Sequence, residues 1–453
     1  MERDVLKSAV NVRYLVLLSA AAALGGVLFG FDVAIITGAG PFLTEHFHLS
    51  ALSLGWAFSS LLFGCVVGSF LAGRNADRYG RRGLLIWVAV LFLATSVASA
   101  LAPNFSAFIV ARFVGGIAVG AASLLCPMYV AEVSPQQFRG RMGTLYQMSI
   151  ITGILISYCI NYLLRNSGAN NWRWMFFTGV VPSAIFFVLM LTAPETPRFL
   201  VMKGKVSEAE SLLERLIGSE DGPVELASIV GATHQAPDVR AAMRRPGVRR
   251  AMYVAFVLAI LIHVSGINTI VDYAPVIFQA AGWKLDAALA STFFVGVTEF
   301  VFTAVSFWVI DRYGRKPLYI VGSIGMAIAL LVLLVAAATG HFYGSFVMVS
   351  ILAYLAFFAA CIGPVFWTLV AEIFPNDVRG TAMIVPVLTQ WVANAVVVLF
   401  FPLAFLRAGK AITFGFLGLM ALAQAIFTWI AVPETKNKSL EEIEAHWVAN
   451  LEV

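Results

Sequence analysis

Four ionisable residues fall inside long apolar stretches of the chain: Asp32, Arg112, Asp272 and Glu299. An ionisable side chain at the centre of a membrane costs at least about 2.5–3.5 kcal/mol on insertion scales, so each is a functional candidate if these stretches cross a membrane. Asp32 and Arg112 are an acid and a base in the same half of the sequence. Protonation of Asp32 would break such an ion pair and free Arg112, which is a workable proton switch. The alternative is a buried pair with a purely structural role.

The composition predicts that the apolar stretches are membrane spans. Of the 453 residues, 60% are hydrophobic and 12% are charged, against about 25% charged in an ordinary soluble domain. This excludes a soluble enzyme, and it excludes a disordered chain because such chains are poor in apolar residues. The net charge of +5 fits positive charge kept on the cytoplasmic side of a lipid bilayer. We expect no nucleic-acid partner.

Twelve apolar segments are long enough to be transmembrane helices. They lie at about 14–37, 53–73, 83–102, 105–130, 142–164, 174–193, 251–278, 287–310, 317–338, 344–371, 381–406 and 411–432. Helices are the expected structure at this apolar density, because backbone polar groups must be satisfied within each segment. We therefore predict an all-α membrane protein.

Charge bias orients the predicted helices. Five of the 30 Lys and Arg residues lie in the connections on one side of the membrane, one lies inside a span, and the others lie on the opposite side or in the termini. Because Lys and Arg collect in cytoplasmic segments, we expect both termini in the cytoplasm and a multi-pass protein of a bacterial-type inner membrane. The four cysteines lie in apolar runs without metal-ligand spacing, so we expect no metal site.

Three motifs occur twice at offsets of 234 to 240 residues. Asp-Arg-Tyr-Gly-Arg begins at Asp77 and again at Asp311, Ala-Glu with a following Pro and Arg-Gly begins at Ala131 and again at Ala371, and Pro-Glu-Thr begins at Pro194 and again at Pro433. Repeats at one offset indicate two homologous halves. We predict a six-helix bundle at 1–193, a partly helical cytoplasmic linker at 194–250, a second six-helix bundle at 251–432 and a cytoplasmic tail at 433–453.

The repeated motifs place acids and arginines at one depth in both halves, where carboxylates and guanidinium groups can pair. We expect a cytoplasmic gate network that latches the halves in one state and releases them in another, with a static set of helix-end pairs as the alternative. Its predicted members are Asp77, Arg78, Arg81, Glu132, Arg139, Glu195, Asp311, Arg312, Arg315, Glu372, Arg379 and Glu434.

These motifs, with Arg112-Phe113-Val114-Gly115-Gly116, Gly266-Ile267-Asn268 and Gly363-Pro364-Val365-Phe366-Trp367, resemble the sugar porter family of the major facilitator superfamily over essentially the whole chain. Bacterial monosaccharide–proton symporters and animal facilitative glucose transporters belong to this family. The resemblance implies the major facilitator fold, with substrate bound midway between two pseudo-symmetric bundles. It also implies a proton-coupling role for Asp32 and Arg112, since the family's uniporters lack the acid.

Sugar recognition needs amide and hydroxyl groups and an aromatic face. The resemblance places Gln147, Asn268, Trp367 and Gln390 at sugar-contacting positions, with the aromatic residues Phe29 and Trp391 nearby. Helix packing is the alternative role for any one of them.

The chain departs from the family pattern in its second half. Two glutamines usually precede Gly-Ile-Asn, whereas this chain has Ile262 and His263; Asp272 and Glu299 also stand at unusual positions. His263, Asp272 and Glu299 have three interpretations: recognition of a modified substrate such as an amino sugar or polyol, an additional proton or cation site, or a structural pair of His263 with Glu299.

The function that this sequence predicts is secondary active, proton-coupled symport of a hexose or pentose by alternating access. A facilitative sugar or polyol uniporter is the first alternative, and a non-transporting membrane sugar sensor is the second. We expect no enzyme activity, no catalytic residue and no cofactor, with the proton gradient as the energy source. The expected partners are a small sugar, a proton and the bilayer, and the chain is expected to act as a monomer.

Overall fold

The computed structural model describes residues 10–234, 243–375 and 378–436, and this part of the chain is helical without strands. Twelve of its helical segments are long and apolar enough to cross a membrane. They coincide with the twelve segments predicted from the sequence. The prediction of an all-α membrane protein is therefore confirmed.

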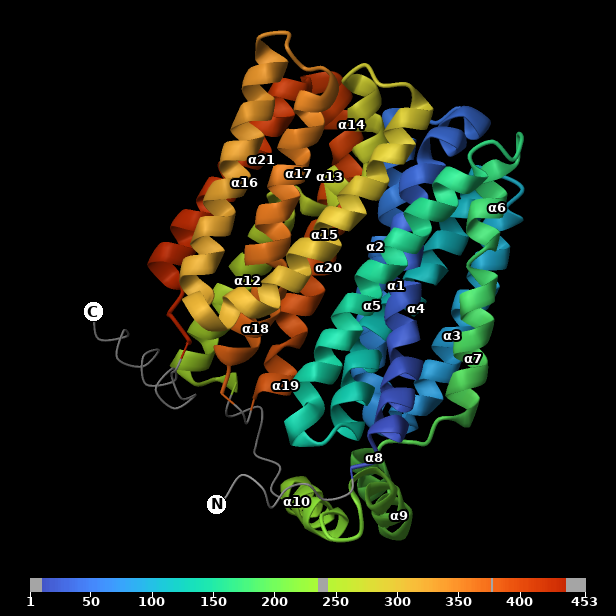
Figure 1. The fold of residues 1–453 in the computed structure, drawn as a ribbon, viewed down its shortest axis with the longest axis vertical. Helices are drawn as coiled ribbons and strands as arrows, with labels where there is room; N and C mark the ends of the chain where they lie inside the picture. Colours follow the sequence, from blue (N-terminus) through green and yellow to red (C-terminus); the bar gives the residue numbers. More distant parts are fainter. Residues whose placement is uncertain (1–9, 235–242, 376–377, 437–453) are drawn as a thin grey trace.

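The first half forms one bundle, seen at the right of Figure 1. Its spans are α1 (Val12–Phe47), α2 (Ala51–Tyr79), α3 (Arg81–Ala100), α4 (Phe105–Val133), α5 (Gln136–Leu164) and the pair α6 (Asn171–Phe177) and α7 (Val180–Thr192). Helix α1 is longer than its predicted apolar segment, which ended at residue 37. It continues through Pro41 and ends where His48 takes a left-handed conformation, with φ of 52°.

The second half forms the other bundle, and three of its spans are broken (Figure 1). Its elements are α12 (Pro246–Val264), α13 (Ile267–Asp272), α14 (Ala274–Ala280), α15 (Leu285–Tyr313), α16 (Arg315–Ala338), α17 (Gly344–Cys361), α18 (Gly363–Glu372), α19 (Arg379–Ala382), α20 (Ile384–Leu403), the π-helix η1 (Ala404–Ala408) and α21 (Lys410–Ala431). Gly266, with φ of 98°, separates α12 from α13. Pro364 lies in the first turn of α18, where proline is tolerated because its missing N–H is not needed there.

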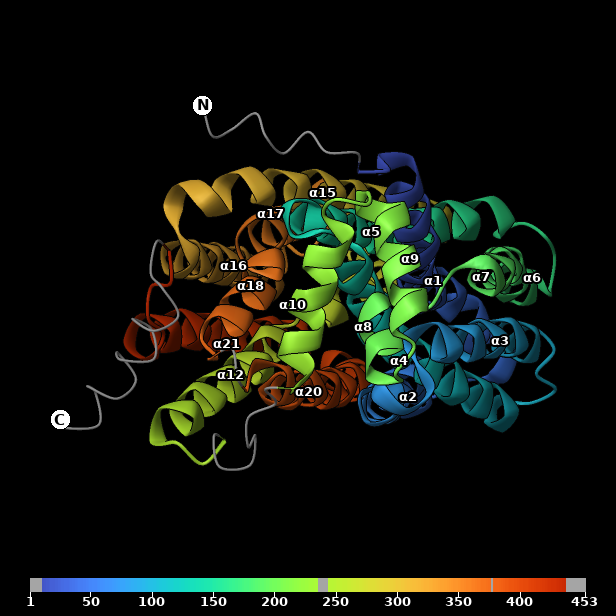
Figure 2. The same ribbon diagram turned by 90° about the horizontal axis from the view of Figure 1, so that it is seen from below.

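The segment between the bundles folds as α8 (Pro197–Met202), α9 (Val206–Ile217) and α10 (Gly222–His234). These helices lie across one end of the molecule, which we call the linker end (Figure 2). The amide of Asn11, just before α1, donates to the carbonyl of Leu216 at 3.0 Å, and the Arg215 guanidinium lies 4.3 Å from the Tyr14 ring centre. These contacts attach α9 to the first bundle. Helix α12 begins at Pro246, inside the stretch predicted as linker.

The bundles touch mainly along two helix pairs, α2 with α20 and α5 with α15, and α1 also contacts α13 and α14. At the end opposite the linker end, Gly55 of α2 packs so closely on α20 that a Cβ atom there would overlap the Leu399 carbonyl oxygen. Tyr273 spans the same region. Its ring stacks on Phe58 at 4.4 Å, and its hydroxyl donates to the Val398 carbonyl at 3.0 Å. The molecule is therefore closed at this opposite end.

Substitution of Gly55 by valine is expected to separate α2 from α20, because the added side chain needs space that the Leu399 backbone occupies. The expected increase in separation is about 2 Å, set by the side chains at the contact. The measurement is the distance between spin labels on the exposed positions Leu52 and Leu406, after replacement of the exposed Cys159. Gly83→Ala is the control, since a Cβ atom there meets no atom within 4 Å. An unchanged distance in Gly55→Val would contradict the prediction.

Candidate functional site

Asp32 of α1 and Arg112 of α4 form a direct ion pair inside the first bundle. Arg112 Nη1 donates to Asp32 Oδ1 at 2.7 Å, and Nη2 donates to the backbone carbonyl of Asp32 at 2.9 Å. The Arg112 side chain is 1% exposed and the Asp32 side chain 16%. The Phe176 ring also lies 5.3 Å from the guanidinium carbon. The sequence-predicted pair therefore exists, and its charges neutralise each other where water is scarce.

A cavity of about 680 Å³ separates the two bundles beside this pair. Its volume falls in the usual range for small-molecule sites. Phe29 and Val33, which flank Asp32 on α1, both line it. Toward the linker end its wall includes Ser69, Gly143 and Arg315. The cavity therefore reaches from mid-span to the repeated motifs at the linker end.

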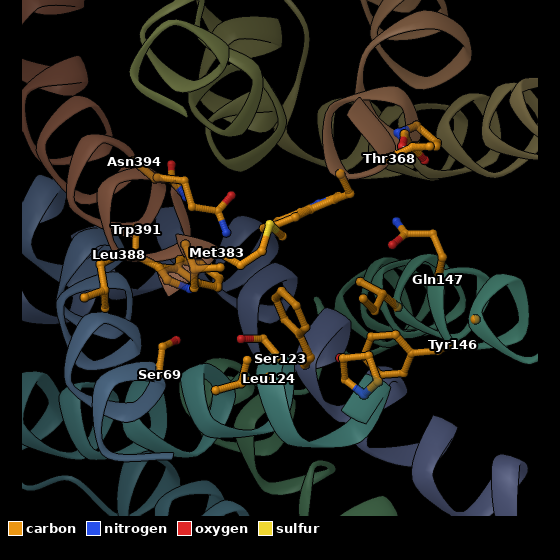
Figure 3. Close-up of a pocket in the computed structure, with 18 of the residues that line it drawn as sticks. Ser69, Ser123, Leu124, Tyr146, Gln147, Thr368, Met383, Leu388, Trp391 and Asn394 are labelled. Atoms are coloured by element: carbon orange, nitrogen blue, oxygen red, sulfur yellow. The ribbon is translucent and has the colours of Figure 1, made fainter. Parts of the chain in front are cut away.

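All six sequence-predicted substrate residues line this cavity: Phe29, Gln147, Asn268, Trp367, Gln390 and Trp391. In Figure 3, Gln147 of α5 lies across the cavity from Trp391 and Asn394 of α20. The rings of Phe29 and Trp391 approach to 5.9 Å between centres, although they belong to different bundles. The cavity thus presents amide groups and aromatic faces from both halves, which suits a polyhydroxylated ring with an apolar side.

His263 lines the same cavity and contacts Gln390, with Nε2 3.3 Å from Oε1. The predicted alternative of a structural pair between His263 and Glu299 is wrong, because the imidazole points to α20 and not to α15. The cavity lining includes neither Asp272 nor Glu299. Of the three unusual residues, His263 therefore lies at the cavity, whereas Asp272 and Glu299 lie outside its lining.

At the linker end of the first bundle, Arg81 is held by two carboxylates. Its Nη2 lies 3.0 Å from Asp77 Oδ1 and 2.9 Å from Glu132 Oε1. Glu195 accepts from the backbone amides of Arg81 and Arg82, each at 3.1 Å. Thr196 donates its hydroxyl to Glu132 at 2.6 Å. The network thus connects α2, the start of α3, α4 and the start of the linker.

The second bundle repeats this arrangement. Arg315 Nη2 lies 3.0 Å from Glu372 Oε1, and Glu434 accepts from the backbone amides of Arg315 and Lys316. Thr435 donates to Glu372 at 2.5 Å. Thr196 and Thr435 were missing from the predicted network, although the repeated Pro-Glu-Thr motif contained the signal.

The ion pairs that the structure gives for the predicted network members each join residues of one bundle. Arg78 and Arg312 lie over aromatic rings of their own bundles, and Arg379 donates to the Phe374 carbonyl at 3.2 Å. The side chains of Arg139 and Asp311 lie outside the described part of the structure. Among the network side chains that the structure describes, these ion pairs form no latch between the halves, so the latch stays a prediction for another conformation.

Twelve spans in two bundles, with a central cavity that reaches one end and is closed at the other, define a secondary membrane transporter of the major facilitator fold. The family model described as "Sugar (and other) transporter" matches residues 18–447. The chain belongs to this family.

Curated relatives include proteins named as sugar–proton symporters. The chain is 37% identical over 449 residues to the arabinose–proton symporter of Bacillus subtilis (97% of this chain, 96% of the relative). It is 36% identical over 489 residues to the D-xylose–proton symporter of Escherichia coli K12 (98% and 97%). These relatives are transporters, and this protein is likewise a transporter and not an enzyme.

Solved structures of the xylose transporter XylE from E. coli are similar to this one. The inward open conformation gives a TM-score of 0.86 at 35% identity, covering 96% of this chain and 100% of that one. A structure bound to 6-bromo-6-deoxy-D-glucose gives 0.80 at 36% identity, with 96% and 100% covered. The predicted fold of two six-helix bundles is confirmed.

Arg112→Leu is expected to destabilise the protein by about 3–5 kcal/mol, because it leaves Asp32 buried without its cation. The double variant Asp32→Asn with Arg112→Leu is expected to be more stable than Arg112→Leu alone, since no uncompensated charge remains. The measurement is thermal unfolding of the purified protein in detergent. The control pair is Arg165 with Asp286, at 3.0 Å but 21% and 70% exposed, where removal of one partner should cost about 1 kcal/mol or less. Equal losses at both pairs would contradict the prediction.

Proposed function

We propose that the protein is a proton-coupled symporter of a monosaccharide, working by alternating access. The observation that carries the proposal is the Asp32–Arg112 ion pair, which lies on the same helix turns as the cavity-lining residues Phe29 and Val33. A proton on Asp32 removes the charge that holds Arg112. Because α1 also lines the cavity, the protonation state of Asp32 can alter the position of groups that contact the sugar.

The cavity supports a hexose or pentose as substrate. Its polar groups are mainly neutral amides and hydroxyls, from residues such as Gln147, Asn268 and Thr368, together with the His263 ring. Neutral groups that both donate and accept hydrogen bonds match sugar hydroxyls. The names of the arabinose and xylose symporters favour a pentose among the candidates.

The conformation supports opening toward the cytoplasm. The cavity reaches the linker end, and the TM-score is higher against the inward open XylE structure than against the sugar-analogue complex. The basic residues of the linker region indicate that this end faces the cytoplasm. We propose a monomer in a bacterial inner membrane, with both termini and α8–α10 on the cytoplasmic side. Rocking of the bundles about the cavity would then expose the sugar alternately.

Asp32→Asn is expected to abolish accumulation of sugar against its gradient while exchange across the membrane continues. The amide keeps the shape of the side chain but cannot take up and release the coupling proton. The measurement is uptake into proteoliposomes with and without an imposed pH gradient. The panel comprises hexoses, pentoses, polyols and amino sugars.

Each outcome of this assay has a meaning. A pH-driven accumulation that survives in Asp32→Asn would overturn the coupling role of that residue. Equilibration without accumulation by the unmodified protein would instead identify a facilitative uniporter. No uptake of any sugar would favour the non-transporting sensor.

Gln147→Ala is expected to raise KM for the transported sugar about tenfold with a smaller effect on the maximal rate. The loss corresponds to one hydrogen bond worth about 1 kcal/mol or slightly more. Gln279→Ala is the matched control, because Gln279 is an exposed glutamine of α14 outside the cavity. The measurement is the concentration dependence of initial uptake rates. An unchanged KM in Gln147→Ala would remove this residue from the binding site.

A further inference from the structure

Asp272 and Glu299 lie where the second bundle contacts the first, away from the central cavity. Asp272 ends α13 and is 5% exposed. Glu299 lies on α15, and its Oε2 atom is buried. Glu299 is close enough for its negative charge to act on Asp272. We call this pair the seam acids.

Close contacts fix the position of this group between the bundles. Gly296, one turn before Glu299 on α15, packs against α5, and a Cβ atom there would lie 2.7 Å from Leu155 and 3.0 Å from Tyr158. Tyr273, which follows Asp272, stacks on Phe58 of α2. Both seam acids are thus adjacent to contacts that must separate if the end opposite the linker end opens.

Buried polar side chains of α1 and α5 lie on the first-bundle side of this contact. Among the described residues, the Asn161 amide oxygen and nitrogen have no hydrogen-bond partner, while the hydroxyls of Tyr158 and Thr37 face each other. Each of these three residues is 1% exposed. The Tyr158 hydroxyl neighbours Thr37 and is within electrostatic range of both seam acids. A buried polar group costs free energy unless it is satisfied, so this part of the interface is polar as well as buried.

The charges at the seam do not balance if both acids are ionised. The positive charge of Arg112 is within electrostatic range of Asp272, but Arg112 already forms an ion pair with Asp32 at 2.7 Å. Within the described residues, neither seam carboxylate has a hydrogen bond or an ion pair of its own. An ionised carboxylate buried without a partner is very costly, and carboxylic acids escape this cost by binding a proton.

We propose that Asp272 and Glu299 form a second proton-binding site, distinct from the Asp32–Arg112 pair, that is occupied when the bundles are closed at the end opposite the linker end. A proton from water forms an O–H bond on one seam carboxylate and removes its charge. Opening of the seam admits water, and the carboxylates then release the proton. The state that is closed at the end opposite the linker end binds more protons than the open state. Lowering the pH therefore shifts the equilibrium toward the closed state. This inference goes beyond sugar transport, since it needs no substrate.

The experiment measures closure of the full-length protein in lipid nanodiscs without sugar, between pH 8 and pH 5.5. Spin labels at Leu52 of α2 and at Leu406 of η1, which directly follows α20, report the separation of these helices. The exposed Cys159 is replaced. In the otherwise unmodified protein, the ratio of closed to open molecules should rise as pH falls, by up to about tenfold per pH unit for each proton bound. The double variant Asp272→Asn with Glu299→Gln should stay closed at both pH values, because its amides mimic the protonated acids.

The other titratable groups near the seam are tested separately. They are Asp32 of α1, Tyr158 of α5, Tyr273 before α14 and Asp286 of α15. Asp286→Asn is the matched control, since this exposed acid crosses the same seam to Arg165 at 3.0 Å. Asp286→Asn should keep the pH response, while each single seam variant, Asp272→Asn or Glu299→Gln, should weaken it.

Several results would overturn the proposal. One is closure that does not change with pH in the unmodified protein, and another is a response that persists in the folded double variant. A response lost in Asp286→Asn or Asp32→Asn but kept in the seam variants would assign it to those acids. Closure driven at pH 8 by sodium in place of choline would indicate a metal-cation site. Each result is independent of the sugar-accumulation assay, so failure here leaves proton-coupled symport untouched.

Discussion

A charged side chain in the hydrocarbon region of a membrane needs an opposite charge, a proton or water. The buried acids and the buried arginine of this transporter follow that constraint. Arg112 and Asp32 neutralise each other across α4 and α1 at 2.7 Å. Arg112 is thereby occupied, and neither Asp272 nor Glu299 has an ion pair among the residues that the structure describes. The arrangement of the two bundles therefore determines where protons can bind.

The linker end shows how the repeated sequence becomes a repeated structure. In each bundle an arginine contacts a glutamate of the neighbouring span, as Arg81 contacts Glu132 and Arg315 contacts Glu372. A second glutamate accepts from the backbone amides at the start of the following helix, where the helix dipole favours negative charge. The ion pairs of the described network residues thus join helices within one bundle.

The central cavity combines groups that neither bundle supplies alone. Gln147 and Phe29 come from the first bundle, whereas Asn268, Gln390 and Trp391 come from the second. His263 adds an imidazole beside Gln390. A ligand that touches both walls gains contacts only when the bundles approach each other, so binding and closure are energetically linked.

The sequence by itself determined the twelve spans, the two halves and the Asp32–Arg112 pair, and its resemblance to a known family indicated six of the cavity-lining residues. Apolar length fixes where a helix crosses a membrane, repeated motifs fix the symmetry, and few buried charges leave few ways to pair them. Only the tertiary structure decided that His263 contacts Gln390, 127 positions away, and that Asp272 and Glu299 lie at the seam. Sequence gives the depth of a residue along its helix, but helix rotation and packing decide which neighbour its side chain meets.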